Sequence, residues 1–163
     1  MNKKLIGAIN KQIGMELYSS FLYRSMAVHC HLANYKGFGA WLDAQADEET
    51  SHAMKFYNYL LERGEKPVFP KLEAPPADFK SVLAIFEQAL AHEKHITESI
   101  NYIYKLSLDE ADYPTQIMLQ WFIKEQVEEE ANANEMVEYL KMAGDKPGTI
   151  MMLDHQAGKR KKG

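Results

Sequence analysis

Cysteine is almost absent from this sequence: Cys30 is the only one among 163 residues. A single thiol cannot form a disulfide within the chain, which is typical of a reducing cytoplasm. Long hydrophobic runs are lacking too, since none approaches the roughly 18 apolar residues that a membrane-spanning helix needs. An amphipathic pattern begins within Met1–Leu5, without an apolar signal region before it. We therefore expect a cytoplasmic protein that does not interact with a membrane.

Basic residues are few over most of the chain. Lys and Arg number 19 against 23 Asp and Glu, and four of the 19 stand together in the C-terminal run 159–162. The rest of the chain is therefore more acidic than the net charge of −4 suggests. This balance argues against nucleic-acid binding and favours the attraction of cations. The sequence also has no phosphate-binding loop, nucleophile elbow or Cys-x-x-Cys zinc motif.

Apolar residues recur with a period of about 3.6 along nearly the whole chain, and no alternating strand pattern competes with it. Turn residues divide this pattern into five predicted helices, which cover Lys3–Ala33, Lys36–Arg63, Asp78–Leu108, Asp112–Gly144 and Pro147–Gln156. Asp78 is the expected N-cap of the third helix. A proline-rich connection of about a dozen residues precedes it, longer than the usual turn of a helical bundle. The sequence thus predicts an all-α four-helix bundle with one long crossover between helices 2 and 3, plus a short fifth helix. We expect residues 1–157 to form one domain and residues 158–163 a disordered basic tail.

Each of the four long helices carries a row of residues that should face the bundle core, and each row has a Glu near its middle. These are Glu16, Glu49, Glu93 and Glu129. A buried carboxylate costs several kcal/mol unless it is protonated, paired or bound to metal, and no Lys or Arg lies on the rows between them. His52 stands one helical turn after Glu49, so both side chains can bind the same ion. Four such carboxylates at one level predict a site for a pair of metal ions.

Oxygen-rich ligands with one imidazole indicate iron rather than structural zinc. We expect Glu16 and His52 to bind opposite metals, while Glu49 and Glu93 can bridge them or bind the second. Gln126 and Glu129, one turn apart, can complete the shell of the second metal. Tyr23 is either an ordinary core tyrosine or a residue that donates a hydrogen bond or an electron to the site. Three further acidic residues form a neighbouring stripe that could hold a third metal or be a solvated face: Glu48, Glu125 and Glu128.

Four motifs, taken in this order and spacing, resemble those of prokaryotic non-haem ferritins over about residues 3–155. They are the segment from Glu16 to Tyr23, the segment from Glu48 to His52, the pair His92-Glu93, and the segment from Trp121 to Glu130. The resemblance implies a ferritin-like fold and a ferroxidase centre whose ligands are Glu16, Glu49, His52, Glu93, Gln126 and Glu129, with Tyr23 close by. It also implies a third iron site at Glu48, Glu125 and Glu128.

The resemblance further implies a hollow shell of 24 subunits that oxidises Fe(II) with oxygen or peroxide and stores the ferric product as a mineral. Bacterioferritins and rubrerythrins carry two Glu-x-x-His motifs, whereas this chain has Gln126 and Glu129 without a second His, which argues against haem. Two alternatives stay open. One is a small di-iron enzyme that acts on peroxide or an organic substrate without mineral storage, and the other is a structural bundle without metal.

Overall fold

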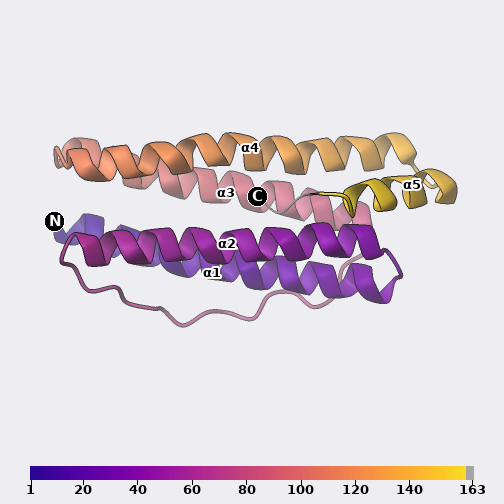
Figure 1. Cartoon of the computed structure of the whole chain (residues 1–163), viewed down its shortest axis with the longest axis horizontal. Helices are drawn as coiled ribbons and strands as arrows, with labels where there is room; N and C mark the ends of the chain where they lie inside the picture. Colours follow the sequence, from indigo (N-terminus) through magenta and orange to yellow (C-terminus); the bar gives the residue numbers. More distant parts are fainter. Residues whose placement is uncertain (161–163) are drawn as a thin grey trace.

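Two helical hairpins lie against each other in the computed structural model, which describes residues 1–160. The helices are α1 (Lys3–Leu32), α2 (Lys36–Glu62), α3 (Val82–Asp109), α4 (Tyr113–Ala143) and α5 (Pro147–Ala157). Helices α1 and α2 form one antiparallel pair and α3 and α4 the other, while the crossover runs along the outside of the first pair (Figure 1). No strand occurs among the described residues. The predicted bundle, with its long crossover and short fifth helix, is confirmed.

The start of the third helix was predicted wrongly. Helix α3 begins at Val82, and its N-cap is Ser81, whose side-chain oxygen accepts a hydrogen bond of 3.1 Å from the backbone nitrogen of Ala84. Asp78 instead belongs to the crossover. The reason is length: α2 has 27 residues and is therefore about 40 Å long, a span that a dozen residues could cross only when fully extended. Asp and Ser are both good caps, so the reach of the crossover decided between them.

The apolar core is split into two clusters by a layer of buried polar side chains. One cluster, near α5, includes Phe38 and Phe86, and the other, near the opposite end of the bundle, includes Phe56 and Phe122. Between them lie ten buried polar residues from all four long helices: Gln12, Glu16, Ser19, Ser20, Gln45, Glu49, His52, Glu93, Gln126 and Glu129. This layer is closed off by apolar packing at both ends, so its charges are shielded from bulk water along the bundle axis.

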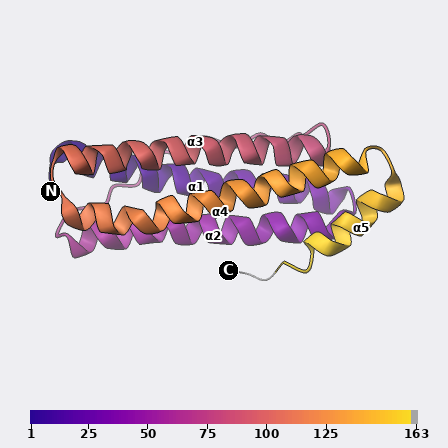
Figure 2. The same cartoon turned by 90° about the horizontal axis from the view of Figure 1, so that it is seen from above.

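Helix α5 turns back at the end of α4 and packs against the beginning of α2 (Figure 2). The backbone nitrogen of Phe38 donates a 2.8 Å hydrogen bond to the Asp154 carboxylate. A Cβ atom on Gly37 would lie 1.6 Å from the Asp154 carbonyl oxygen, so only glycine permits this contact. Of the expected basic tail, residues 158–160 are described, and Arg160 contacts α2. Residues 161–163 lie outside the described part, and the domain boundary at residue 157 stays a prediction.

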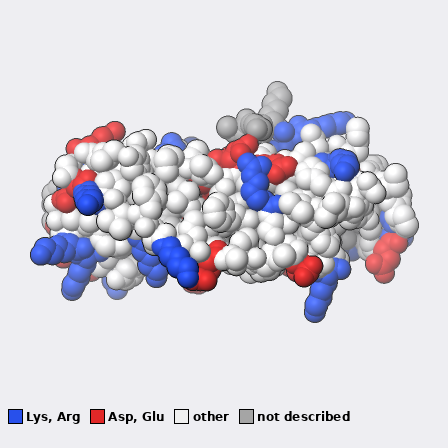
Figure 3. All heavy atoms as spheres, turned by 90° about the horizontal axis from the view of Figure 1, so that it is seen from below, with Lys and Arg blue, Asp and Glu red and all other residues white. Residues whose placement is uncertain are grey.

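Charged side chains of both signs are scattered over the face shown in Figure 3, with wide uncharged areas between them. Among the described helices, none combines the length and the apolar character that crossing a membrane requires.

Candidate metal centre

The six residues predicted to form the paired metal site all lie in the buried polar layer. Helix α1 contributes Glu16, α2 contributes Glu49 and His52, α3 contributes Glu93, and α4 contributes Gln126 and Glu129. Their side chains are nearly inaccessible to solvent, with exposed fractions between 1% and 4%. The Glu residues stand at the same level of the bundle because each occupies the core-facing row of its helix near the middle.

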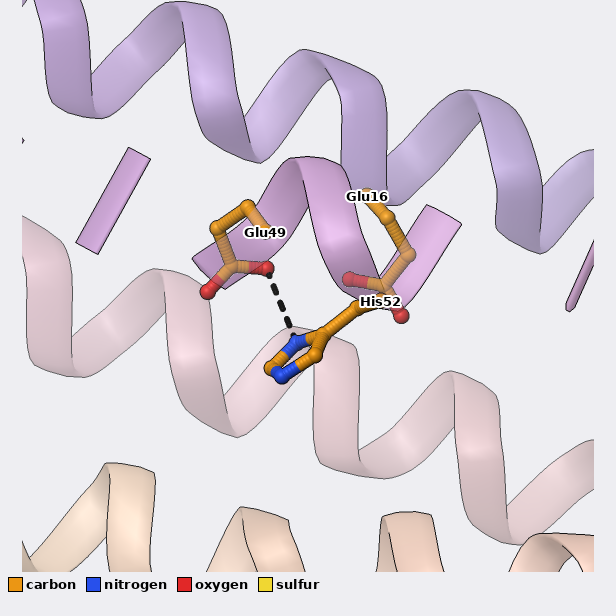
Figure 4. Close-up of side chains that lie close together, drawn as sticks. All are labelled: Glu16, Glu49 and His52. Atoms are coloured by element: carbon orange, nitrogen blue, oxygen red, sulfur yellow. Dashed lines mark ion pairs between the residues drawn. The ribbon is translucent and has the colours of Figure 1, made fainter. Parts of the chain in front are cut away.

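Two of the carboxylate groupings could each hold one metal ion, and Glu49 belongs to both. Glu16, Glu49 and His52 offer ligand atoms that all lie within 4.8 Å of one another, as do Glu49, Glu93 and Glu129. Metal–ligand bonds of about 2.0–2.2 Å place opposite ligands of one ion about 4.4 Å apart, so this spread suits an ion after small side-chain adjustments. Figure 4 shows the first group, in which Nδ1 of His52 lies 3.6 Å from Oε2 of Glu49.

This arrangement differs in one detail from the expectation drawn from the sequence. Glu16 and His52 were assigned to opposite metals, whereas their ligand atoms lie in the same candidate group, and which metal each binds stays a prediction. Helix α1 packs closely on α2, and this packing brings the Glu16 side chain beside His52 rather than across the site from it. Glu93 and Glu129, from the other hairpin, form the second group with Glu49.

The electrostatics of the layer call for a bound cation or bound protons. Within residues 1–160, no Lys or Arg forms an ion pair with Glu16, Glu49, Glu93 or Glu129. Burial, together with the neighbouring Glu49 carboxylate, raises the pKa of Glu93 and of Glu129 to about 8. The same causes raise the pKa of Glu16 well above its usual value. Oε2 of Glu16 is buried without a hydrogen-bond partner in the described structure, which fits an oxygen kept for a metal.

Two glutamine amides hold the ligand carboxylates from behind, each one helical turn before a ligand. Nε2 of Gln12 donates to Oε1 of Glu16 over 2.8 Å. Nε2 of Gln45 donates to Oε1 of Glu49 over 3.0 Å and to Oε2 of Glu129 over 2.6 Å. Such partners fix the orientation of a ligand and leave its other oxygen available to a metal.

Tyr23 and Gln126 both bind the Glu93 carboxylate. The Tyr23 hydroxyl donates to Oε1 of Glu93, and Nε2 of Gln126 donates to Oε2 over 3.1 Å. Burial and the nearby Glu93 carboxylate raise the pKa of Tyr23 well above its usual value, so the phenol keeps its proton. Tyr23 therefore lies beside the site, where it can donate a hydrogen bond, and Gln126 needs only an amide rotation to present its oxygen to a metal.

The outer acidic stripe is divided between two places. Glu125 offers a ligand atom within 4.8 Å of those of His52 and Glu129, in a third group that could hold an ion. Glu48 and Glu128 are in none of the three groups; they line a surface pocket of about 330 Å³ together with Trp41 and Arg160. The third iron site at Glu48, Glu125 and Glu128 stays a prediction.

Comparison with known proteins decides the family. The family profile described as ferritin-like domain matches residues 6–143. The chain belongs to the ferritin family. The bacterial non-heme ferritin of Staphylococcus saprophyticus is 36% identical over 160 residues, which cover 98% of this chain and 96% of that protein. The corresponding protein of Staphylococcus epidermidis is 34% identical with the same coverage. Both the resemblance inferred from the motifs and the ferritin-like fold are confirmed.

Solved structures give the same result. An open-pore ferritin from the hyperthermophilic archaeon Archaeoglobus fulgidus matches with a TM-score of 0.97 and 37% identity, over 99% of this chain and 98% of that chain. A variant engineered to form a closed A. fulgidus ferritin also matches with a TM-score of 0.97.

Several residues around the centre were not predicted from the sequence. Gln12 repeats the spacing that Gln45 has to Glu49, and this repeated Gln-x-x-x-Glu pattern was a readable signal. His92 is half-buried, with Nε2 2.7 Å from the Ser19 hydroxyl. The nearby His95 is exposed. No pattern pointed to the position of Arg160.

Proposed function

We propose that this protein stores iron in the cytoplasm and oxidises Fe(II) at the paired site of each subunit, with O2 or H2O2 as the electron acceptor. The observation that carries the proposal is the sharing of Glu49 between two buried ligand groups. A shared carboxylate keeps two ions close together, and two Fe(II) ions can then supply two electrons to one acceptor molecule. Membership of the ferritin family supports iron storage as the role of this chemistry.

In this proposal each ligand has a defined task. Glu16 and His52 bind one iron, Glu93 and Glu129 bind the other with the help of Gln126, and Glu49 bridges the two. The buried carboxylates release their protons when iron binds, because a metal ion replaces the proton as the compensating charge. The hydrogen bond from the Tyr23 hydroxyl holds the Glu93 carboxylate in place while Fe(II) is oxidised to Fe(III). The ligand set holds one imidazole and no thiolate, which suits iron without haem.

A hollow shell of 24 subunits would store the ferric mineral. Several large apolar side chains are exposed on the isolated subunit. They include Leu32, Ile117, Val127 and Met142, with exposed fractions of 81%, 69%, 71% and 74%. Burial of such residues against neighbouring subunits would stabilise an assembly. The match to A. fulgidus ferritins over nearly the whole chain supports the same arrangement.

The test is an aerobic iron challenge followed by size-exclusion chromatography. Fe(II) is added far beyond the two or three ions that the ligands of one subunit can hold, and iron and protein are measured in each fraction. We expect a large excess of iron to elute with a particle of several hundred kilodaltons. Iron that stops at site stoichiometry on a small oligomer would instead support the alternative, a di-iron enzyme without storage.

Variants separate the paired site from the shell. We expect Glu49→Gln and His52→Ala to slow Fe(II) oxidation about 100-fold or more, while the particle size is unchanged, because the first replaces the shared carboxylate by a neutral amide and the second removes the imidazole. His95→Ala on the surface of α3 is the matched control and should oxidise iron at the wild-type rate. Normal oxidation by both ligand variants would rule out the assigned centre.

A further inference from the structure

Arg160, three residues after the end of α5, reaches the outer side of the metal centre. One guanidinium nitrogen, Nη2, lies 2.7 Å from Oε2 of Glu48, and the other, Nη1, donates a 2.8 Å hydrogen bond to Oε1 of Gln45. The guanidinium also lies over the Trp41 ring, 4.3 Å from its centroid. The side chains of Arg160 and Glu48 are only 18% and 19% exposed, so this ion pair is more sheltered than an ordinary surface pair.

The position of Arg160 follows from the docking of α5. This helix is held on α2 by the close approach at Gly37 and by the hydrogen bond between Phe38 and Asp154. Ala157, the last residue of α5, is buried in the core cluster that contains Trp41. The chain then continues along α2 from this fixed point (Figure 2). Arg160 is thereby delivered to Glu48.

Gln45 links Arg160 to the ligands. Its amide oxygen accepts from Arg160, while its amide nitrogen donates to Glu49 and Glu129. If the amide were reversed, its oxygen would face two carboxylates and its nitrogen would face a guanidinium, which is unfavourable at both ends. Arg160 thus fixes the Gln45 orientation in which both ligands receive a hydrogen bond.

We propose that Arg160 is a built-in cation that excludes a third metal ion from the pocket lined by Glu48 and Glu128 and, through Gln45, positions Glu49 and Glu129. The inference rests on the proposed paired site. Glu48 can use the same carboxylate oxygen for Arg160 or for a metal, and the two cations repel each other, so they compete. A third ion at Glu48 therefore binds only after Arg160 has moved away, and Arg160 sets how readily that ion is held beside the pair.

The experiment is a titration of the metal-free full-length protein with Zn(II), a redox-inert stand-in for Fe(II), by calorimetry. We expect the wild type to bind two ions tightly and a third only weakly. Arg160→Gln should bind the third ion about fivefold more tightly or better, since it removes the competing ion pair. A chain that ends at Lys159 should behave in the same way, and it keeps the test valid if Arg160→Gln folds poorly.

Three further variants make the result specific. Arg160→Lys keeps the positive charge and should restore weak binding of the third ion, and Lys159→Gln, the neighbouring exposed cation, should match the wild type. The double variant Glu48→Gln/Arg160→Gln should lose the increase in affinity for the third ion that Arg160→Gln alone shows. If Arg160→Gln and the shortened chain bind the third Zn(II) ion with the same affinity as the wild type, the proposed role of Arg160 is overturned. Failure of all variants and the wild type to bind two ions would instead reject the paired site.

Discussion

The buried carboxylates should make the metal-free protein lose stability as the pH rises, and Glu93→Gln should remove a defined part of that loss. Burial and the Glu49 carboxylate raise the pKa of Glu93 from 4.5 to about 8. Between these values the folded state holds a proton that the unfolded state has released. The stability linked to this proton is complete below pH 4.5, falls as the pH rises, and is lost once the pH passes 8.

The magnitude follows from proton linkage. One retained proton costs about 1.4 kcal/mol of unfolding free energy per pH unit, so Glu93 accounts for about 3 kcal/mol between pH 5 and pH 7. For a chain of this length that corresponds to roughly 6–12 °C in melting temperature. Glu129, whose pKa is also raised to about 8, should contribute a similar fall. Glu93→Gln keeps an acceptor for the Tyr23 hydroxyl but cannot titrate. Between pH 5 and pH 7 the melting temperature of this variant should therefore fall by roughly 6–12 °C less than that of the wild type.

The assay is thermal unfolding followed by circular dichroism at pH 5, 6 and 7, in the presence of a chelator. Glu87→Gln, an exposed substitution on the same helix, is the matched control and should show the same pH dependence as the wild type. Saturating Zn(II) should flatten the wild-type curve, because the metal replaces the protons. The reasoning fails if the melting temperature of the metal-free wild type does not fall from pH 5 to pH 7, or if Glu93→Gln and Glu87→Gln behave alike.

Two further predictions concern the frame around the site. Gly14→Ala should destabilise the protein by about 1–3 kcal/mol, because a Cβ atom there would lie 2.3 Å from Cγ of Pro70 in the crossover. Gly7→Ala, with open space around it on the same helix, should stabilise by about 0.5–1 kcal/mol, and denaturant unfolding that ranks the two variants otherwise would contradict this packing. Asp112→Ala should cost about 1–2 kcal/mol at pH 7, since Asp112 caps α4 and binds Arg63 with both oxygens, over 2.8 Å and 3.0 Å. Arg63 lowers the pKa of Asp112 to about 2, so this difference should shrink as the pH falls from about 4 towards 2, and a difference independent of pH would argue against the ion pair.

Much of the fold could be predicted because helical periodicity is a local property. Each long helix has a core-facing row with helical spacing, and the ends of the helices were predicted to within a few residues except at the start of α3. That start depended on how far the crossover must reach, a quantity that no local pattern contains. Asp78 was the expected cap, and the distance across the bundle selected Ser81 instead.

Contacts between helices were harder to predict. Ser99 donates a 2.6 Å hydrogen bond to the amide oxygen of Gln12, although the two residues are 87 positions apart. His92 reaches Ser19 across a similar separation in sequence. Such pairs depend on the rotation of each helix about its axis and on side-chain rotamers, which sequence spacing does not fix.

The sequence by itself determined that four carboxylates and one histidine are buried near the middle of a four-helix bundle. It did so because a Glu in the middle of a core-facing row is buried when the row packs, and long helices that lie side by side bring their middles together. Only the tertiary structure decided which of these residues bring ligand atoms close together: Glu49 belongs to both groups, and Glu16 lies with His52. It also decided that the docking of α5 brings Arg160 onto Glu48 and Gln45. These arrangements depend on the packing of separate helices, and periodicity within one helix says nothing about its register against another.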